Sequence, residues 1–277
     1  MNRKGESIID AKSPLFSFSF SECLAYRDLL LLLIKKEFLA SYKQTLLGPV
    51  WLVLQPLLTL TVWVMVFSRG VGLSTGRLPA PVFYLSGLLF FQFFSQSLVG
   101  ISSCLRQQAS VLAKVYFPRL LVPLSIVGWR LATALIQFFL FVLVSLYYHP
   151  RIGWPAALLV LPPLFILTGA LSLGIGLVVT ALTVKYRDLQ QVMLVLTQLW
   201  LYATPILYPA SALPATGRRL IFLNPMSTIV ETFRSLAFGL PAPPASALEW
   251  AILSTIAILA VGFFCFGRVE GTFVDEI

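Results

Sequence analysis

The chain has 277 residues, of which 58% are hydrophobic and 11% charged, and its mean hydropathy is +0.89. A water-soluble fold of this size cannot bury so much apolar surface, which excludes an ordinary soluble domain. The formal charge of +9 would suit nucleic acid, but the basic residues lie between apolar runs and form no basic patch on a polar segment. The composition therefore predicts a membrane protein without a nucleic-acid partner.

Stretches without any charged residue predict the membrane spans. Six such stretches have 18 or more residues: 44–68, 78–105, 131–150, 152–184, 189–217 and 250–267. A helix needs roughly 20 apolar residues to cross a hydrocarbon core of about 30 Å. The apolar runs are continuous and lack the alternation of an outer-membrane barrel, whereas helices satisfy their own backbone hydrogen bonds in lipid. The sequence predicts an all-α membrane protein with a domain of six transmembrane helices at 47–267.

The N-terminal part is too charged to cross a membrane. Residues 1–20 are predicted to form a polar tail, and residues 21–46 an amphipathic helix on the cytoplasmic membrane surface. Within this interface helix, Lys35, Lys36 and Lys43 can attract an anionic lipid headgroup. Alternatively, these lysines only fix the topology of the chain and attract bulk anionic lipid.

The distribution of basic residues predicts which side each connection faces. Thirteen lysines and arginines fall on the side of the two termini and six on the other, so both termini, including a tail at 268–277, are expected in the cytoplasm. Arg130 remains unassigned. If the third span starts near Leu120, this arginine lies roughly 15 Å inside the membrane; if the span starts at Leu131, its side chain reaches the interface.

The connections between the spans differ in length and composition. A polar cytoplasmic stretch at 104–118 joins the second and third spans, and Lys185–Asp188 joins the fourth and fifth as a tight hairpin. Seven prolines fall between residues 205 and 248, around two apolar pieces too short to span. Irregular backbone at membrane depth requires surrounding protein or water, so this segment is interpreted as re-entrant short helices on the outer side. An ordinary external loop is the alternative.

The chain lacks the residues that most enzymes use. No Gly-x-x-x-x-Gly-Lys-Ser/Thr sequence is present to bind nucleotide phosphates, so any dependence on ATP must come from a partner. His149 is the only histidine, Asp188 and Glu231 are expected on opposite sides of the membrane, and the three cysteines are far apart. We therefore expect no catalytic residue, no metal site and no cofactor in this chain.

Polar side chains recur on one face of the first and fifth predicted spans. They are Trp51, Gln55, Thr59 and Trp63 in the first span and Gln190, Thr197, Thr204 and Tyr208 in the fifth, with Gln92 and Gln96 in the second. Polar residues inside a membrane are costly and tend to line a pathway, which predicts a polar and aromatic conduit. Hydrogen bonding between helices of the bundle explains the same pattern equally well.

Several short motifs resemble those of a known family. The segment YKQTLLGPVW at 42–51, followed by LQPL at 54–57, resembles the entry to the first span in permease subunits of ATP-binding-cassette polysaccharide exporters. Further similarities follow in the expected order: Phe117-Pro118-Arg119, KYRDL at 185–189, TPILYP at 204–209, Asn224-Pro225-Met226 and Phe233-Arg234. The resemblance covers about residues 27–266. One departure is Gly128-Trp129-Arg130, which places a cation where an uncharged stretch is expected.

The resemblance implies a half-transporter that forms a homodimer and binds two copies of a separate ATPase subunit, which would hold ATP and magnesium. Members of this family export lipid-pyrophosphate-linked polysaccharides such as O-antigen, capsule or teichoic acid across the bacterial inner membrane. By this resemblance the chain is expected to be a transport subunit, most directly for O-antigen, with a channel at the dimer axis. Aromatic side chains suit a channel along which a sugar chain slides.

The resemblance also implies roles for particular residues. The channel wall would include Trp51, Gln55, Thr59, Trp63, Thr197, Trp200, Thr204 and Tyr208. The connection at 104–118 would couple the chain to its ATPase through Arg106, Lys114, Tyr116 and Arg119. The external gate at 205–240 would include Pro205, Pro209, Asn224, Pro225, Glu231 and Arg234.

Other functions remain open on the sequence alone. A small-molecule or drug exporter of the same fold would need a closed apolar pocket in place of a long aromatic groove. A membrane-embedded glycan-processing enzyme would need acid and base residues, which are scarce here. A secondary transporter is disfavoured because no internal repeat is visible and intramembrane carboxylates are few.

Overall fold

The structure is a computed structural model that describes residues 26–43, 45–108, 117–186 and 188–270. Within these ranges the chain is all-helical and contains no strand, which confirms the predicted fold class. The α-helices are α2 (Arg27–Tyr42), α3 (Trp51–Trp63), α4 (Ala80–Gln107), α6 (Leu121–Tyr148), α7 (Trp154–Lys185), α8 (Leu189–Tyr202), α9 (Ala215–Ile221), α10 (Pro225–Phe238) and α11 (Ala245–Glu270). Two short 3₁₀ helices, η1 (Gly48–Val50) and η3 (Ala210–Ala212), and a π-helical stretch, η2 (Val64–Gly70), accompany them. The predicted tail at 1–20 lies outside the described residues.

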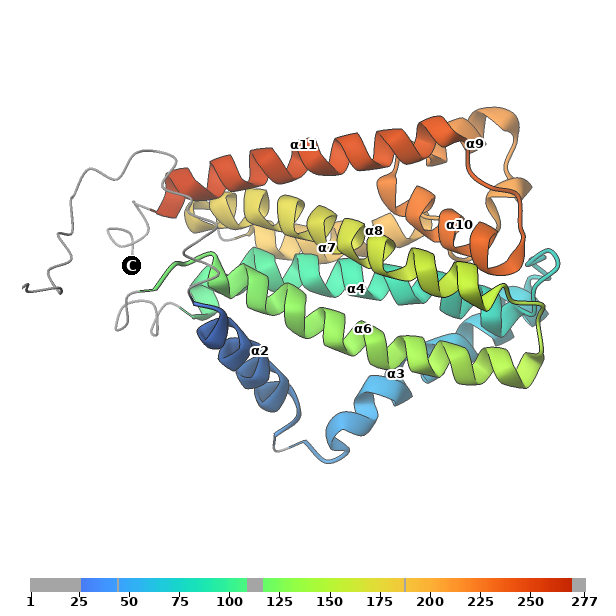
Figure 1. The fold of residues 1–277 in the computed structure, drawn as a ribbon, viewed down its shortest axis with the longest axis horizontal. Helices are drawn as coiled ribbons and strands as arrows, with labels where there is room; N and C mark the ends of the chain where they lie inside the picture. Colours follow the sequence, from blue (N-terminus) through green and yellow to red (C-terminus); the bar gives the residue numbers. More distant parts are fainter. Residues whose placement is uncertain (1–25, 44, 109–116, 187, 271–277) are drawn as a thin grey trace, which may run out of the picture.

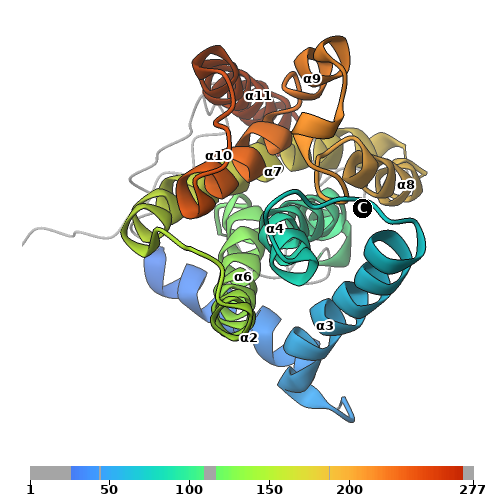
Figure 2. The same cartoon turned by 90° about the vertical axis from the view of Figure 1, so that its right-hand side faces the viewer.

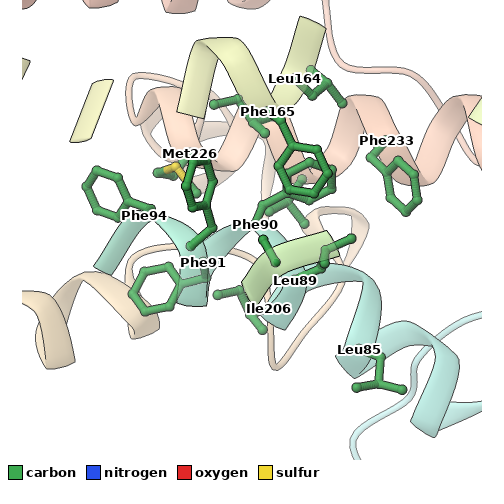
Figure 3. Packing of buried hydrophobic residues seen from close by; sticks show 14 of the residues in the cluster. Leu85, Leu89, Phe90, Phe91, Phe94, Leu164, Phe165, Ile206, Met226 and Phe233 are labelled. Carbon is green, nitrogen blue, oxygen red and sulfur yellow. The ribbon is translucent and has the colours of Figure 1, made fainter. Parts of the chain in front are cut away.

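Helix α4 lies in the middle of the bundle (Figure 2). It contacts α3, α6, α7, α8 and α10, and most of its residues are buried. Its Phe90 ring packs against Phe165 of α7 and Phe233 of α10, with ring centroids 5.2 Å apart in both pairs. Figure 3 shows Ile206, from the turn after α8, and Met226, from α10, in the same apolar cluster. Aromatic side chains of one helix thus join elements that are far apart in sequence.

Five helical segments are long and apolar enough to cross a membrane. They are Gly48–Gly70, Ala80–Gln107, Leu121–Tyr148, Trp154–Thr183 and Ala245–Val269. The helix in the fifth charge-free stretch, 189–217, is too short to cross a membrane, because α8 ends at Tyr202. Pro205 contributes to this early end, since proline removes a backbone donor and disfavours helical conformation in the residue before it. Helix length therefore does not confirm the six-span count.

The proline-rich segment 205–240 contains two short helices with different surroundings. Helix α9 is largely exposed, whereas α10 is almost entirely buried and contacts α4, α7 and α11. Figure 1 places α10 at the end of the bundle opposite to α2. Asn224 caps the start of α10 by accepting a hydrogen bond from the Met226 amide, and Gly239 ends the helix in the left-handed conformation, with φ 65°. The sequence thus defines both ends of a buried helix.

Helix α2 packs against α6, and a glycine allows the close approach. The rings of Phe38 and Trp129 make an edge-to-face contact with centroids 5.1 Å apart. A Cβ atom on Gly128 would lie 2.6 Å from Ile34 Cδ1, so the isoleucine side chain would have to shift to make room for it. Gly128 and Trp129, the two residues before Arg130, therefore form the surface of α6 against which α2 packs.

Helices α7 and α11 are in backbone contact. A Cβ on Gly174 would lie 2.8 Å from the backbone of Leu259, and a Cβ on Gly262 would lie 2.5 Å from the carbonyl oxygen of Gly174. Small residues let membrane helices approach this closely, and the resulting dispersion contacts hold the helices together. The pair of glycines therefore fixes α11 against α7.

Replacing Gly262 with alanine is expected to destabilise the protein by about 1–3 kcal/mol, because the methyl group would meet a backbone that cannot rotate away. Gly267 lies in the same helix, and a Cβ there meets nothing within 4 Å, so Gly267→Ala is the matched control. Alanine favours a helix over glycine by about 1 kcal/mol, so the control should be neutral or stabilising. Thermal unfolding in detergent measures both variants, and equal midpoints would contradict the backbone contact.

Candidate functional site

A buried arginine holds the broken backbone that follows α8. The side chain of Arg234 in α10 is fully buried, and its guanidinium lies 3.7 Å from the centre of the Phe83 ring. Its nitrogen atoms donate hydrogen bonds to five groups: the carbonyl oxygens of Phe83 (2.9 Å), Pro205 and Ile206 (3.5 Å), the Ser86 hydroxyl (3.0 Å) and the Glu231 carboxylate (2.8 Å). This side chain therefore connects α10, the start of α4 and the turn after α8.

The chemistry of this cluster requires arginine. The carbonyl groups of Pro205 and Ile206 lie where the helix is broken, and buried carbonyls without a partner are strongly unfavourable. Arginine presents five N–H donors in a rigid fork, whereas lysine presents three donors on one nitrogen. Glu231, one turn before Arg234, balances the buried charge. The ion pair and the carbonyl contacts thus depend on the same guanidinium.

Asn224 fixes the other side of the same turn. Its side-chain oxygen accepts hydrogen bonds from the Trp200 indole (3.0 Å) and the Met226 amide (3.0 Å). Its side-chain nitrogen donates to the Ala203 carbonyl (3.1 Å) and the Thr204 hydroxyl (3.0 Å). Reversing the amide would place its NH₂ group against two other N–H groups, so the network defines its orientation. One side chain thus ties the end of α8 to the start of α10.

The residues predicted for an external gate come together around this turn. Pro205 lies within it, Asn224 and Pro225 begin α10, and Glu231 and Arg234 lie on the buried face of α10, while Pro209 precedes η3. Ser86 and Phe83 complete the site from α4, 148 and 151 residues before Arg234. These two partners gave no signal in the sequence, because a serine and a phenylalanine in an apolar run have many other uses.

The eight residues predicted for a channel wall differ in exposure. Trp51 and Gln55 are exposed, Thr59, Trp63, Trp200 and Tyr208 are half-buried, and Thr197 and Thr204 are buried within the chain. The hydroxyl of Thr197 donates to carbonyl groups of its own helix, and that of Thr204 donates to the Trp200 carbonyl. Hydrogen bonding within the chain therefore accounts for the two buried threonines in and directly after α8.

Helices α3 and α8 lie on the same side of the bundle, flanking α4 (Figure 2). Most of the α8 surface is exposed, including Gln191 and Gln198, and only Met193 and Thr197 are buried. Trp51 and Gln55 are exposed near the start of α3. We call these exposed surfaces of α3 and α8 the open face. It combines apolar side chains with amides and one indole.

The predicted coupling segment falls largely outside the described residues. Lys114 and Tyr116 lie in the stretch 109–116, of which the structure describes nothing. Arg106 is exposed at the end of α4, and Arg119 is half-buried immediately before α6. The two described arginines therefore flank the segment from both sides.

Helix α2 is tied to the same end of the bundle. The side-chain nitrogen of Gln108, directly after α4, donates a hydrogen bond to the Glu37 carboxylate of α2 at 2.9 Å. Lys35, Lys36 and Lys43 are exposed, the first two on α2 and the third directly after it. The interface helix thus contacts the bundle through Glu37 and keeps its lysines accessible.

Replacing Arg234 with lysine is expected to loosen the turn after α8, because lysine keeps the charge beside Glu231 but cannot reach all the carbonyl groups. Each buried carbonyl left without a partner costs about 1–3 kcal/mol. Arg219→Lys on the exposed helix α9 is the matched control. Limited proteolysis in detergent should cut Arg234→Lys earlier than the control between residues 203 and 224. Identical cleavage patterns would show that Arg234 does not hold this turn.

Comparison with known proteins confirms the resemblance. Residues 28–238 match the family model described as ABC-2 type transporter. The chain is 29% identical to the O-antigen export system permease protein RfbA of Myxococcus xanthus, over 92% of this chain and 98% of that protein. It is 27% identical to a Klebsiella pneumoniae protein of the same name, over 90% of this chain and 94% of that protein. The chain therefore belongs to the ABC-2 type transporter family and is a multi-pass permease subunit of an ABC exporter, a transport subunit rather than an enzyme.

Proposed function

We propose that this permease exports lipid-linked polysaccharide, most directly O-antigen, across the bacterial inner membrane, with both termini in the cytoplasm. The observation that carries the proposal is the alignment, over nearly the full length of both chains, with proteins named as O-antigen export permeases. Two copies of a separate ATPase subunit would bind ATP and magnesium, because this chain has no loop for nucleotide phosphates. The permease itself would act as a homodimer.

In this proposal α8 is a short sixth span that is completed by irregular backbone. Its 14 residues extend about 21 Å, less than the roughly 30 Å of a hydrocarbon core. Thr204 and Ile206, which follow the helix, are fully buried in protein. Irregular backbone is tolerated at membrane depth only under such protection. The burial of α10 between α4, α7 and α11 supports the same interpretation for the re-entrant gate helix.

The open faces of two protomers would enclose the path of the polysaccharide. Trp51 offers a surface on which sugar rings can stack, and Gln55, Gln191 and Gln198 offer hydrogen bonds without a charge that would trap the polymer. Thr197 and Thr204 are assigned to a supporting role, because their hydroxyls bond within the protomer. The wall would thus be formed by the exposed members of the predicted set.

Helix α4 would carry movement from the ATPase to the gate. One end of α4 leads into Gln108, which binds Glu37 of the interface helix. The other end holds Phe83 and Ser86, which bind Arg234. The helix is continuous over Ala80–Gln107, so a displacement at one end reaches the other. Nucleotide would bias one of two arrangements of these contacts.

Replacing Arg119 with glutamate is expected to uncouple ATP hydrolysis from export, because this residue follows the segment that would dock on the ATPase. Export should fall at least tenfold while membrane insertion and ATP hydrolysis persist. Arg151→Glu is the matched control, since Arg151 is exposed in the connection between α6 and α7, away from α2. Surface polysaccharide and vesicle ATPase activity are measured together. Full export by Arg119→Glu would remove this residue from coupling.

Deleting the gene for this chain in the organism that carries it tests the cargo. We expect loss of surface O-antigen and accumulation of lipid-linked polymer on the cytoplasmic leaflet, both reversed by the intact gene. Undiminished surface polysaccharide would refute the proposed function. Uptake of a hydrophobic dye by inverted vesicles, with no change in polysaccharide, would indicate a small-molecule exporter instead.

A further inference from the structure

A polar cavity of about 380 Å³ lies between α2, α3, α4 and α6. Apart from one leucine, the residues that line it are Ser41, Trp51, Gln55, Gln96, Arg130 and Gln137. Its volume falls within the range of roughly 300–1,000 Å³ that is typical of small-molecule sites. We call it the arginine cavity. Its lining comes from four helices, so it exists only in the folded protein.

Arg130 lies well inside α6. The helix begins at Leu121, so Arg130 lies within regular helix whether the span itself begins near Leu120 or at Leu131. Arg130 is the tenth residue of the helix and lies about 13 Å along its axis from Leu121. A charged residue inside a membrane-spanning helix is costly, and such residues commonly mark binding sites or pathways. The position of this cation thus favours a functional role.

The lining of the arginine cavity favours an anion. Arg130 is the one charged residue among the described lining residues, and none of them is acidic. Arg130 Nη1 donates to the side-chain oxygen of Gln96 at 2.9 Å. Because this oxygen already accepts a hydrogen bond, Gln96 presents chiefly its NH₂ group to a ligand. The Trp51 indole and the Gln55 amide add further N–H donors.

A second hydrogen bond, between two glutamine side chains, joins the helices α4 and α6 that line the arginine cavity. The side-chain nitrogen of Gln137 donates to the Gln92 oxygen at 2.7 Å, which joins α6 to α4. With the Arg130–Gln96 hydrogen bond, two polar bridges therefore connect these helices. If these polar residues served only to hold α4 and α6 together, the two hydrogen bonds would be sufficient. They do not explain why an open cavity lies beside them, bordered by Gln55 and Trp51 of α3.

We propose that the arginine cavity binds the phosphate group of an anionic lipid. The guanidinium of Arg130 would contact the phosphate oxygens, and Trp51 would cover the adjoining sugar or glycerol. Basic pockets between membrane helices are suited to anionic headgroups. Two lipids carry this chemistry: the pyrophosphate-linked carrier of the polysaccharide and the anionic phospholipids of the bilayer. The first source rests on the proposed function and would make the cavity the place where the substrate headgroup is held.

Lipid binding to the full chain tests this proposal. The protein is placed in nanodiscs of phosphatidylcholine and titrated with undecaprenyl pyrophosphate, undecaprenol or phosphatidylglycerol, and native mass spectrometry counts the bound lipid. We expect undecaprenyl pyrophosphate to bind at least tenfold more tightly than undecaprenol, which lacks phosphate. Equal binding of undecaprenyl pyrophosphate and phosphatidylglycerol would support the phosphate site and assign it to bulk phospholipid. Equal binding of undecaprenyl pyrophosphate and undecaprenol would overturn the proposal.

Two variants separate a binding role of the cavity from a structural one. Arg130→Gln removes the cation, and Gln55→Glu adds a carboxylate at an exposed position where the fold should tolerate it. Each should weaken binding of undecaprenyl pyrophosphate at least tenfold, whereas Arg130→Lys should weaken it less. Arg77→Gln, in the exposed connection before α4, is the control and should bind as the native chain does. Native affinity in Gln55→Glu would refute the site even if Arg130→Gln fails to fold.

The two proposals can fail separately. If deletion of the gene leaves surface polysaccharide unchanged but the purified chain binds lipid phosphate through Arg130, the proposed function fails and the site stands. If deletion abolishes surface polysaccharide while the Arg130 and Gln55 variants bind lipid normally, the proposed function stands and the site fails.

Discussion

The arrangement of α4, α10 and the turn after α8 depends on the hydrogen bonds of the buried Arg234 guanidinium. The chain breaks its helix at Pro205, and lipid offers no water to satisfy the freed carbonyl groups. Arg234 supplies the missing donors from α10, while Asn224 binds the other side of the turn. Because Asn224 caps α10 and Arg234 lies within it, the short helix and the break stabilise each other. If this segment acts as the proposed gate, its geometry is defined by these hydrogen bonds.

The bundle combines tightly and loosely packed parts. In the most apolar part of the span Ala80–Gln107, 72% of the residues are buried, and the backbones of α7 and α11 touch at Gly174 and Gly262. In the corresponding part of the span Gly48–Gly70, which includes α3, only 17% are buried within the chain. Displacing α3 therefore breaks few contacts inside the chain. The π-helical stretch Val64–Gly70 directly follows α3. Such π-helical turns are rare and are often found at functional sites. Helices α2 and α3 are therefore expected to move relative to α4, α7 and α11, which would move together as one body.

Charge-free runs in the sequence predicted the positions of the five membrane-length helices, because a charge within a span is costly in lipid. In α6 the run 131–150 covers only part of the helix, since Arg130 lies within it. The charge-free runs did not reveal that α8 is short, since the run 189–217 contains no charge yet includes the break at Thr204-Pro205. Arg234 was predicted as one residue of an external gate, but the sequence did not indicate that its side chain is fully buried. A sequence shows that an arginine is present but not that Ser86 and Phe83, distant in the chain, will surround it. The arginine cavity likewise depends on packing of four helices.

The short length of α8 has a consequence for the path that the proposed function assigns to the polysaccharide. Along this path the wall would be regular helix for about 21 Å and irregular backbone around Pro205 for the rest of the roughly 30 Å of a bilayer core. The carbonyl groups of a helix are bonded within the helix, whereas those of Pro205 and Ile206 are bonded to the Arg234 side chain. Rotation of one side chain would therefore reshape the irregular part of the wall and leave the helical part unchanged.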